Sequence, residues 1–99
     1  MTSLFATISL SFDDKTKPDD TTLAEEIKIL GLSQYLKATE GSPVELPKYV
    51  YAGQITGADR LEIHRALHRG LNAILKRLSL HGRFFIETSV DQDWSCCFF

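Results

Sequence analysis

The stretch Leu4-Phe-Ala-Thr-Ile-Ser-Leu-Ser-Phe12 carries the alternation of a β-strand. Every second residue from Leu4 to Phe12 is apolar, while most of the positions between them hold threonine or serine. Because side chains alternate between the two faces of a strand, this pattern predicts a strand with one buried face and one face toward water. The rest of the chain must therefore supply a layer that covers the apolar face.

A short helix is predicted after the polar loop at residues 15–20. Thr22 and Glu25 have the spacing of a capping box, and apolar residues recur at helical spacing up to Leu30. Gly31 stands where a left-handed residue commonly terminates a helix. We therefore expect about three turns of helix, from Thr22 to Leu30.

A second, longer helix is predicted from Ala58 to about Leu80, ended by Gly82. Gly70 lies on the flank of its apolar stripe, and a glycine inside a helix costs about 0.5–1 kcal/mol relative to alanine. We therefore expect the backbone at Gly70 to approach another element closely. The stripe itself consists of Ile63, Leu67, Leu71, Ile74 and Leu78.

Three further segments are predicted to be extended. Residues 32–39 and 48–55 form a hairpin joined by a loop at residues 40–47, because Pro43 and Pro47 cannot donate hydrogen bonds within a central strand. The alternation from Arg83 to Val90 predicts a last strong strand. The carboxyl-terminal residues from Trp94 to Phe99 are a candidate for one short strand more.

The order of these elements is β-α-β-β-α-β, which predicts an α+β fold. Such a chain forms a ferredoxin-like sandwich, in which two helices cover one face of a four-stranded antiparallel sheet. With 99 residues, we expect one such domain spanning residues 1–99.

Composition excludes several classes of protein. The chain is 43% hydrophobic with a net charge of −2, which argues against wholesale disorder. No apolar run approaches the ~20 residues that span a bilayer, so we expect no membrane association and a cytoplasmic location. Cys96 and Cys97 are adjacent, which excludes a disulfide framework.

The small net charge conceals a segregation of charge along the chain. Between Ile63 and Arg83 there is no aspartate or glutamate, whereas acidic residues predominate in the first part of the chain. Such a basic segment can neutralise phosphates, although any surface helix also carries charge on its outer face. The residues predicted to contact nucleic acid are Arg65, Arg69, Lys76 and Arg83.

Asp13 and Asp14 follow the first strand and are the candidate catalytic residues. Paired carboxylates can hold Mg²⁺ beside a phosphodiester, which makes Asp13 the candidate metal ligand and Mg²⁺ the candidate cofactor. The alternative interpretation is ordinary turn chemistry, because aspartates are common where a strand ends.

Two histidines lie one helical turn apart. His64 and His68 are close enough in a helix to reach one metal ion, but no third ligand is apparent at matching spacing. A solvated flank of the helix is the favoured interpretation, and a role as acid or base in metal-free RNA cleavage is the alternative.

Large aromatic residues are concentrated in the carboxyl-terminal tail. Trp94, Phe98 and Phe99 are expected to pack against other residues, because a free terminus is usually polar. They pack either on the sheet of the same chain or on a second copy, in which case they form the interface of a homodimer.

The strand end Ser11-Phe12-Asp13, the stretch Gly31-Leu32-Ser33 and the proline-bearing hairpin before the second helix resemble the small ferredoxin-fold endoribonuclease family. Its members include CRISPR-associated adaptation subunits and GhoS-type antitoxins of type V toxin systems. The resemblance covers most of the chain in layout and is weak in residue identity. It implies a homodimer, a metal-binding aspartate at Asp13, and cleavage of a toxin messenger RNA.

Two functions from different classes follow from these observations. The first is a small dimeric RNA-binding protein that acts as a metal-assisted endoribonuclease of antitoxin type. The second is a non-enzymatic regulatory module of phage or host origin that binds a protein partner through a sheet edge or the aromatic tail.

Overall fold

The structure, a computed structural model, describes residues 1–13, 15, 17–37 and 43–90 and has an α+β fold. Within these ranges, neither helix is long and apolar enough to cross a membrane. The elements are β1 (Thr2–Phe12), α1 (Asp20–Ile29), β2 (Tyr35–Lys37), β3 (Pro43–Glu45), β4 (Val50–Gly57), α2 (Arg60–Arg77) and β5 (Gly82–Ser89).

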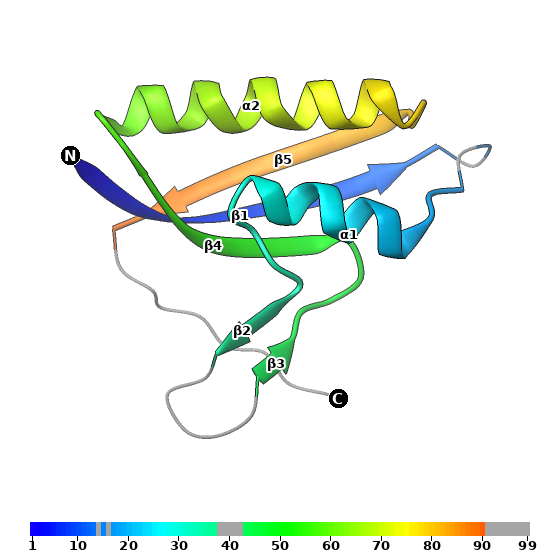
Figure 1. Cartoon of the computed structure of the whole chain (residues 1–99), viewed down its shortest axis with the longest axis horizontal. Coiled ribbons are helices and arrows are strands. Elements are labelled where there is room, and N and C mark those ends of the chain that lie inside the picture. Colours follow the sequence, from blue (N-terminus) through cyan, green and yellow to red (C-terminus); the bar gives the residue numbers. More distant parts are fainter. Residues whose placement is uncertain (14, 16, 38–42, 91–99) are drawn as a thin grey trace.

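The main sheet has three antiparallel strands in the order β4-β1-β5. β1 is the central strand, and its residue Ile8 lies opposite Tyr51 of β4 and Ile86 of β5. β2 and β3 form a separate two-stranded sheet, which projects from the body on the side away from α2 (Figure 1).

The predicted four-stranded sheet is not confirmed. Segment 32–39 was expected to pair with segment 48–55, but of its described residues, 32–37, only Ser33 forms a bridge with Ala52 of β4. The Ser33 hydroxyl then accepts a hydrogen bond from the Tyr35 backbone N–H at 3.1 Å, and this local turn directs the chain away from β4. β2 pairs instead with β3, where Pro43 is tolerated as the first residue of a strand. The proposed strand at residues 94–99 lies outside the described residues.

The predicted buried face of β1 is confirmed. Leu4, Ala6, Ile8 and Leu10 are buried, and they pack with Tyr51 of β4. Both helices contribute to this same core, so they lie on one face of the sheet. The helical residues in the core are Leu23 and Ile27 of α1, and Ile63, Leu67, Leu71 and Ile74 of α2.

Neither helix begins at the residue that the sequence predicted. The first helix begins two residues before Thr22, and the second begins two residues after Ala58. α1 begins at Asp20 because the Asp19 carboxylate accepts hydrogen bonds from the backbone N–H groups of Thr21 and Thr22. The expected capping box at Thr22 is therefore wrong. α2 begins at Arg60, where Asp59 caps the backbone N–H of Glu62 at 2.8 Å.

The helix ends follow different rules. Gly31 has a φ of 92°, which confirms it as the left-handed residue after α1. α2 ends at Arg77, earlier than predicted, and Ser79 adopts the left-handed conformation with a φ of 57°. Gly82 does not end the helix; it is the first residue of β5.

Glycines allow the layers to approach each other closely. A Cβ at Gly70 of α2 would lie 2.6 Å from Leu30 Cδ2, which confirms the predicted close approach at this position. At Gly53 of β4, a Cβ would overlap the carbonyl oxygen of Gly31. The obstacle at Gly53 is backbone, so it cannot move aside as a side chain can.

We predict that Gly53→Ala lowers the free energy of unfolding by about 1–3 kcal/mol, the usual cost of overpacking. Urea denaturation followed by circular dichroism measures this change. The control is Thr56→Ala on the exposed face of the same strand, which should change stability by less than about 0.5 kcal/mol. Equal stability of Gly53→Ala and the wild type would contradict the close contact.

A second prediction concerns alkaline pH. Burial, together with the nearby Asp20 and Tyr49, raises the pKa of Tyr51 from 10.0 to about 12. Folding therefore favours the protonated phenol, and this contribution is complete below pH 10 and is lost as the pH rises toward 12. Two pKa units correspond to at most about 3 kcal/mol. Urea denaturation between pH 9 and 12 should show this loss, and Tyr51→Phe should lack that part of the pH dependence.

Candidate nucleic-acid interface

A groove runs between α2 and β5, which lie beside each other in Figure 1. It has a volume of about 570 Å³, and none of its lining residues is acidic. We call it the basic groove. Its lining residues are His64, Arg65, His68, Gly82, Arg83, Phe84, Phe85 and Ile86.

Helical spacing brings His64 and His68 to the β5 side of α2. The His64 Nε2 atom lies 2.8 Å from the Thr88 hydroxyl oxygen, which joins the helix to the strand. The His68 ring packs edge-on against Phe84, with 5.2 Å between the ring centroids. These two contacts fix the histidines as one wall of the basic groove.

The two histidines do not share a ligand in this arrangement. His64 contacts Thr88, whereas the Nδ1 atom of His68 accepts a hydrogen bond of 3.0 Å from the Asn72 side chain. Among the described residues, no group of three histidine, cysteine, aspartate or glutamate side chains is placed to hold a metal ion. The favoured interpretation was a solvated flank of the helix; His68 is exposed there, whereas His64 is partly buried against Thr88.

Two of the four residues predicted to contact nucleic acid line the basic groove. Arg65 reaches it from α2, and Arg83 reaches it from β5. Arg69 and Lys76 are exposed on α2 outside the groove, and they follow Arg65 at intervals that keep all three on one side of the helix. Arg65, Arg69 and Lys76 therefore form a basic face beside the groove.

Another basic residue of α2 is engaged elsewhere. Arg77 forms an ion pair with Glu26 of α1, so its charge is partly neutralised within the chain. Between the described residues, the ion pairs are this one and that of Lys48 with Asp20, and neither involves a residue of the basic groove.

Asp13 lies near one end of the basic groove. It is exposed and follows β1 directly, and its backbone N–H donates a hydrogen bond of 3.0 Å to the His81 carbonyl oxygen. Asp14, the second candidate catalytic residue, lies outside the described residues. The described part of the chain thus offers Asp13 alone, and not a complete set of ligands for Mg²⁺.

Trp94, Phe98 and Phe99, the residues predicted to form a dimer interface, also lie outside the described residues. In contrast, the structure reveals Phe85 as an exposed aromatic residue, with 63% of its surface accessible. The signal for Phe85 was present in the sequence, because strand alternation that buries Phe84 and Ile86 must direct Phe85 to the opposite face.

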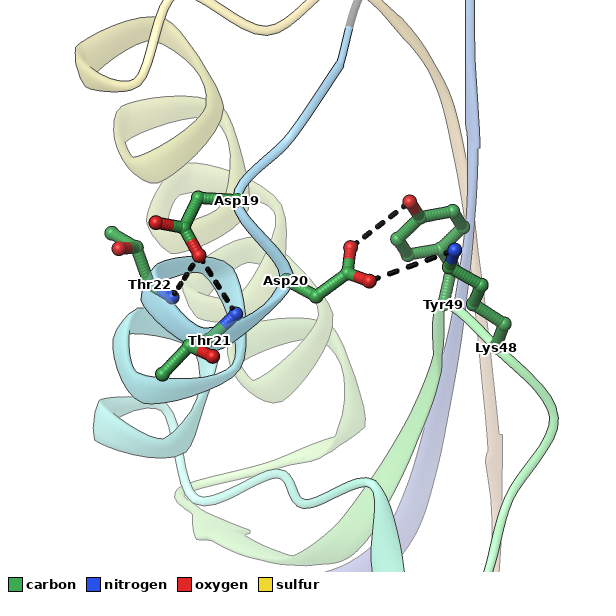
Figure 2. Close-up of polar contacts among 6 residues, drawn as sticks. All are labelled: Asp19, Asp20, Thr21, Thr22, Lys48 and Tyr49. Carbon is green, nitrogen blue, oxygen red and sulfur yellow. Dashed lines mark hydrogen bonds and ion pairs between the residues drawn. The ribbon is translucent and has the colours of Figure 1, made fainter.

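A second polar cluster joins α1 to β4. Figure 2 shows the Asp20 carboxylate directed toward Tyr49 and Lys48. The Tyr49 hydroxyl donates a hydrogen bond of 3.0 Å to Asp20, and the Lys48 ammonium lies 3.5 Å from the same carboxylate. Asp20 raises the pKa of Lys48, as expected for an ion pair. No sequence motif indicates this cluster, because its members are distant in the chain.

The contacts of this cluster indicate a structural role. Tyr49 has a φ of 65°, which a bulky residue adopts only where its surroundings hold it. Its ring packs edge-on against Phe12 at 4.9 Å, and its carbonyl oxygen accepts a hydrogen bond from the Leu10 backbone N–H. The Asp20 contact completes this set, so the cluster fixes the start of β4 against β1 and α1.

Comparisons of the chain with models of known protein families, with characterised proteins and with solved structures gave no significant match. The basic groove is therefore interpreted from its own residues and geometry.

Proposed function

We propose that this protein binds single-stranded RNA along the basic groove and the adjoining basic face. The observation that carries this proposal is the groove lining, in which arginines and histidines from α2 and β5 converge with no acidic residue among them. Two elements that are separate in the sequence thus present one acid-free surface.

The side chains of the basic groove match the chemistry of a single RNA strand. Arginine can donate paired hydrogen bonds to a phosphate, and Arg65 of α2 and Arg83 of β5 both line the groove. The exposed Phe85 ring lies on the opposite face of β5, beside the groove, and offers a surface on which a base that extends past the strand can stack. Phosphate contacts and stacking together favour a single strand, whose bases are free, over a duplex.

The overall charge limits the strength of this interaction. The net charge is −2, so attraction at long range is weak and binding depends on the local basic surface. With about four phosphate contacts, the logarithm of the affinity should fall with the logarithm of salt concentration with a slope of about −3.

The proposal includes a ferredoxin-like type for the fold. The strand order β4-β1-β5 with two helices on one face corresponds to three strands of that sandwich. The bridge between Ser33 and Ala52 would then mark the position of the fourth strand. The resemblance to small ferredoxin-fold endoribonucleases supports RNA as the ligand.

Cleavage of RNA is a separate step beyond binding. The Asp13 backbone is hydrogen-bonded to His81, and His81 precedes Arg83 by two residues. A phosphate bound by Arg83 would therefore lie near the Asp13 carboxylate. Cleavage that requires Mg²⁺ and is lost in Asp13→Asn would extend the proposal from binding to catalysis.

We predict that the double variant Arg65→Gln/Arg83→Gln binds a short unstructured RNA roughly tenfold more weakly than the wild type. Loss of two phosphate contacts should also reduce the salt slope by about 1.4. Fluorescence anisotropy at several salt concentrations measures both quantities.

The matched control is Lys17→Gln/Lys28→Gln, which removes the same amount of charge from exposed positions in the loop before α1 and on α1. Its affinity should remain within about twofold of the wild type, because those lysines lie outside the basic groove. Equal losses in the two double variants, or no RNA binding by the wild type at low salt, would contradict the proposal.

A further inference from the structure

The main sheet has a second face, which is turned away from both helices. On β5, Phe84 and Ile86 pack against the core on the helix side, so the alternate residues lie on the second face. These residues are Arg83, Phe85 and Glu87, and all three are exposed. Phe85 thus lies between a cation and an anion, each about 7 Å away along the strand.

β1 adds a row of hydroxyl groups to the same face. The residues of β1 that lie directly opposite the three β5 residues all carry a hydroxyl group, and they are Ser11, Ser9 and Thr7. Directly opposite side chains have Cβ atoms about 4.5–5.5 Å apart, so these hydroxyls border the Phe85 ring. Because serine and threonine are short, they leave the ring of Phe85 accessible, with 63% of the residue exposed.

The charged groups beside Phe85 are not engaged within the described part of the chain. Neither the Arg83 nor the Glu87 side chain has an ion pair or hydrogen bond with a described residue. In contrast, the carboxylates of Asp20 and Glu26 are each held by a cation of the fold. The Glu87 carboxylate is therefore available to accept hydrogen bonds from a ligand.

A carboxylate distinguishes the four RNA bases by the donors on their Watson–Crick edges. Guanine presents two adjacent N–H donors on this edge, at N1 and N2, and the two oxygens of a carboxylate can accept both hydrogen bonds at once. Adenine, cytosine and uracil each place an acceptor next to their donor, and this acceptor repels the carboxylate. Guanine is therefore the base that Glu87 can hold with two hydrogen bonds.

We propose that the face around Phe85 selects guanine in the bound single strand. The proposal rests on RNA binding along the basic groove, and it adds the identity of one base in that RNA. Arg83 lines the groove and also lies beside Phe85, so a strand whose phosphate contacts Arg83 can place its base on the Phe85 ring. The Watson–Crick edge of this base then faces Glu87.

The position of Glu87 makes it a residue for specificity and not for affinity. It lies about 13 Å from Arg83 along the strand, so it does not neutralise the arginine that contacts phosphate. A carboxylate near bound phosphates lowers affinity by repulsion unless the ligand donates hydrogen bonds to it. Strands without guanine leave this repulsion uncompensated, so Glu87 both favours guanine and disfavours the other bases.

The test compares short uridine strands of about ten nucleotides that carry one guanosine or one adenosine at the centre. Fluorescence anisotropy should show that the wild type binds the guanosine strand about tenfold more tightly than the adenosine strand, as expected for a bidentate contact with a base. Glu87→Gln should reduce this ratio to less than about threefold, because glutamine has one acceptor oxygen in place of two. A strand with inosine, which lacks the N2 amino group, should bind the wild type with intermediate affinity.

The matched control is Glu25→Gln, which removes the same charge from an exposed position on α1 outside the basic groove. Its ratio should remain about tenfold. Equal affinity of the wild type for the two strands would overturn guanine selection and leave RNA binding intact. A ratio that survives Glu87→Gln, or that falls equally in Glu25→Gln, would also overturn it. Failure of the wild type to bind either strand at low salt would contradict the proposed function itself, and base selection with it.

A second measurement separates the base contact from the phosphate contacts. Each affinity should fall as salt concentration rises, whereas the ratio between the two strands should stay constant, because hydrogen bonds to a neutral base release no counterions. A ratio that falls together with the affinities would assign the preference to phosphate contacts and overturn the proposal.

The stacking surface is tested by Phe85→Ala, which should weaken binding of the guanosine strand roughly tenfold. The matched control is Tyr35→Ala, which removes another exposed aromatic ring, on β2, and should change the affinity by less than about twofold. Circular dichroism verifies that both variants are folded. Equal affinities of Phe85→Ala and the wild type would show that no base stacks on this ring.

Discussion

The packing of the apolar face of β1 beneath both helices is the interaction on which the rest of the structure depends. Ile8 is fully buried at the centre of this face, between Tyr51 of β4 and Ile86 of β5. β1 also holds β4 and β5 on its two sides, and the outer edges of these two strands differ in how far they are covered. The edge at β4 is partly covered by Ser33, whereas the edge at β5 is open among the described residues. The basic groove lies at this second edge, so the core packing determines where the candidate site is exposed.

The basic groove illustrates how a surface can be basic on an acidic protein. Its histidines are fixed by contacts with Thr88 and Phe84, which leaves the arginines on either side exposed to solvent. Asp20 is not among the residues that line the groove, and its carboxylate joins α1 to β4. The Asp20 carboxylate thus stabilises the scaffold, whereas Arg65 and Arg83 remain exposed at the groove.

Local patterns in the sequence were sufficient to predict much of this fold. The alternation in β1 and the apolar stripe of α2 depend only on neighbouring residues, and both predictions are confirmed. The pairing of residues 32–39 with β4 was not predictable, because it depends on whether the Ser33 side chain turns the chain aside. For the candidate site, Arg65 and Arg83 were identified by charge alone, whereas their convergence in one groove required the packing of α2 against β5. The Asp20–Tyr49 contact likewise joins residues that no local pattern relates.

The central position of β1 also has a kinetic consequence. Both of its partner strands are distant in the chain, since Phe5 pairs with Gln54 on one side and with Ser89 on the other. Such pairings require large loops to close before they contribute any stability, which slows folding relative to a chain with local contacts. During synthesis, β1 remains without its β5 neighbour until residues 82–89 have left the ribosome. Until then, the backbone N–H and C=O groups on that side of β1 form hydrogen bonds with water instead of with β5.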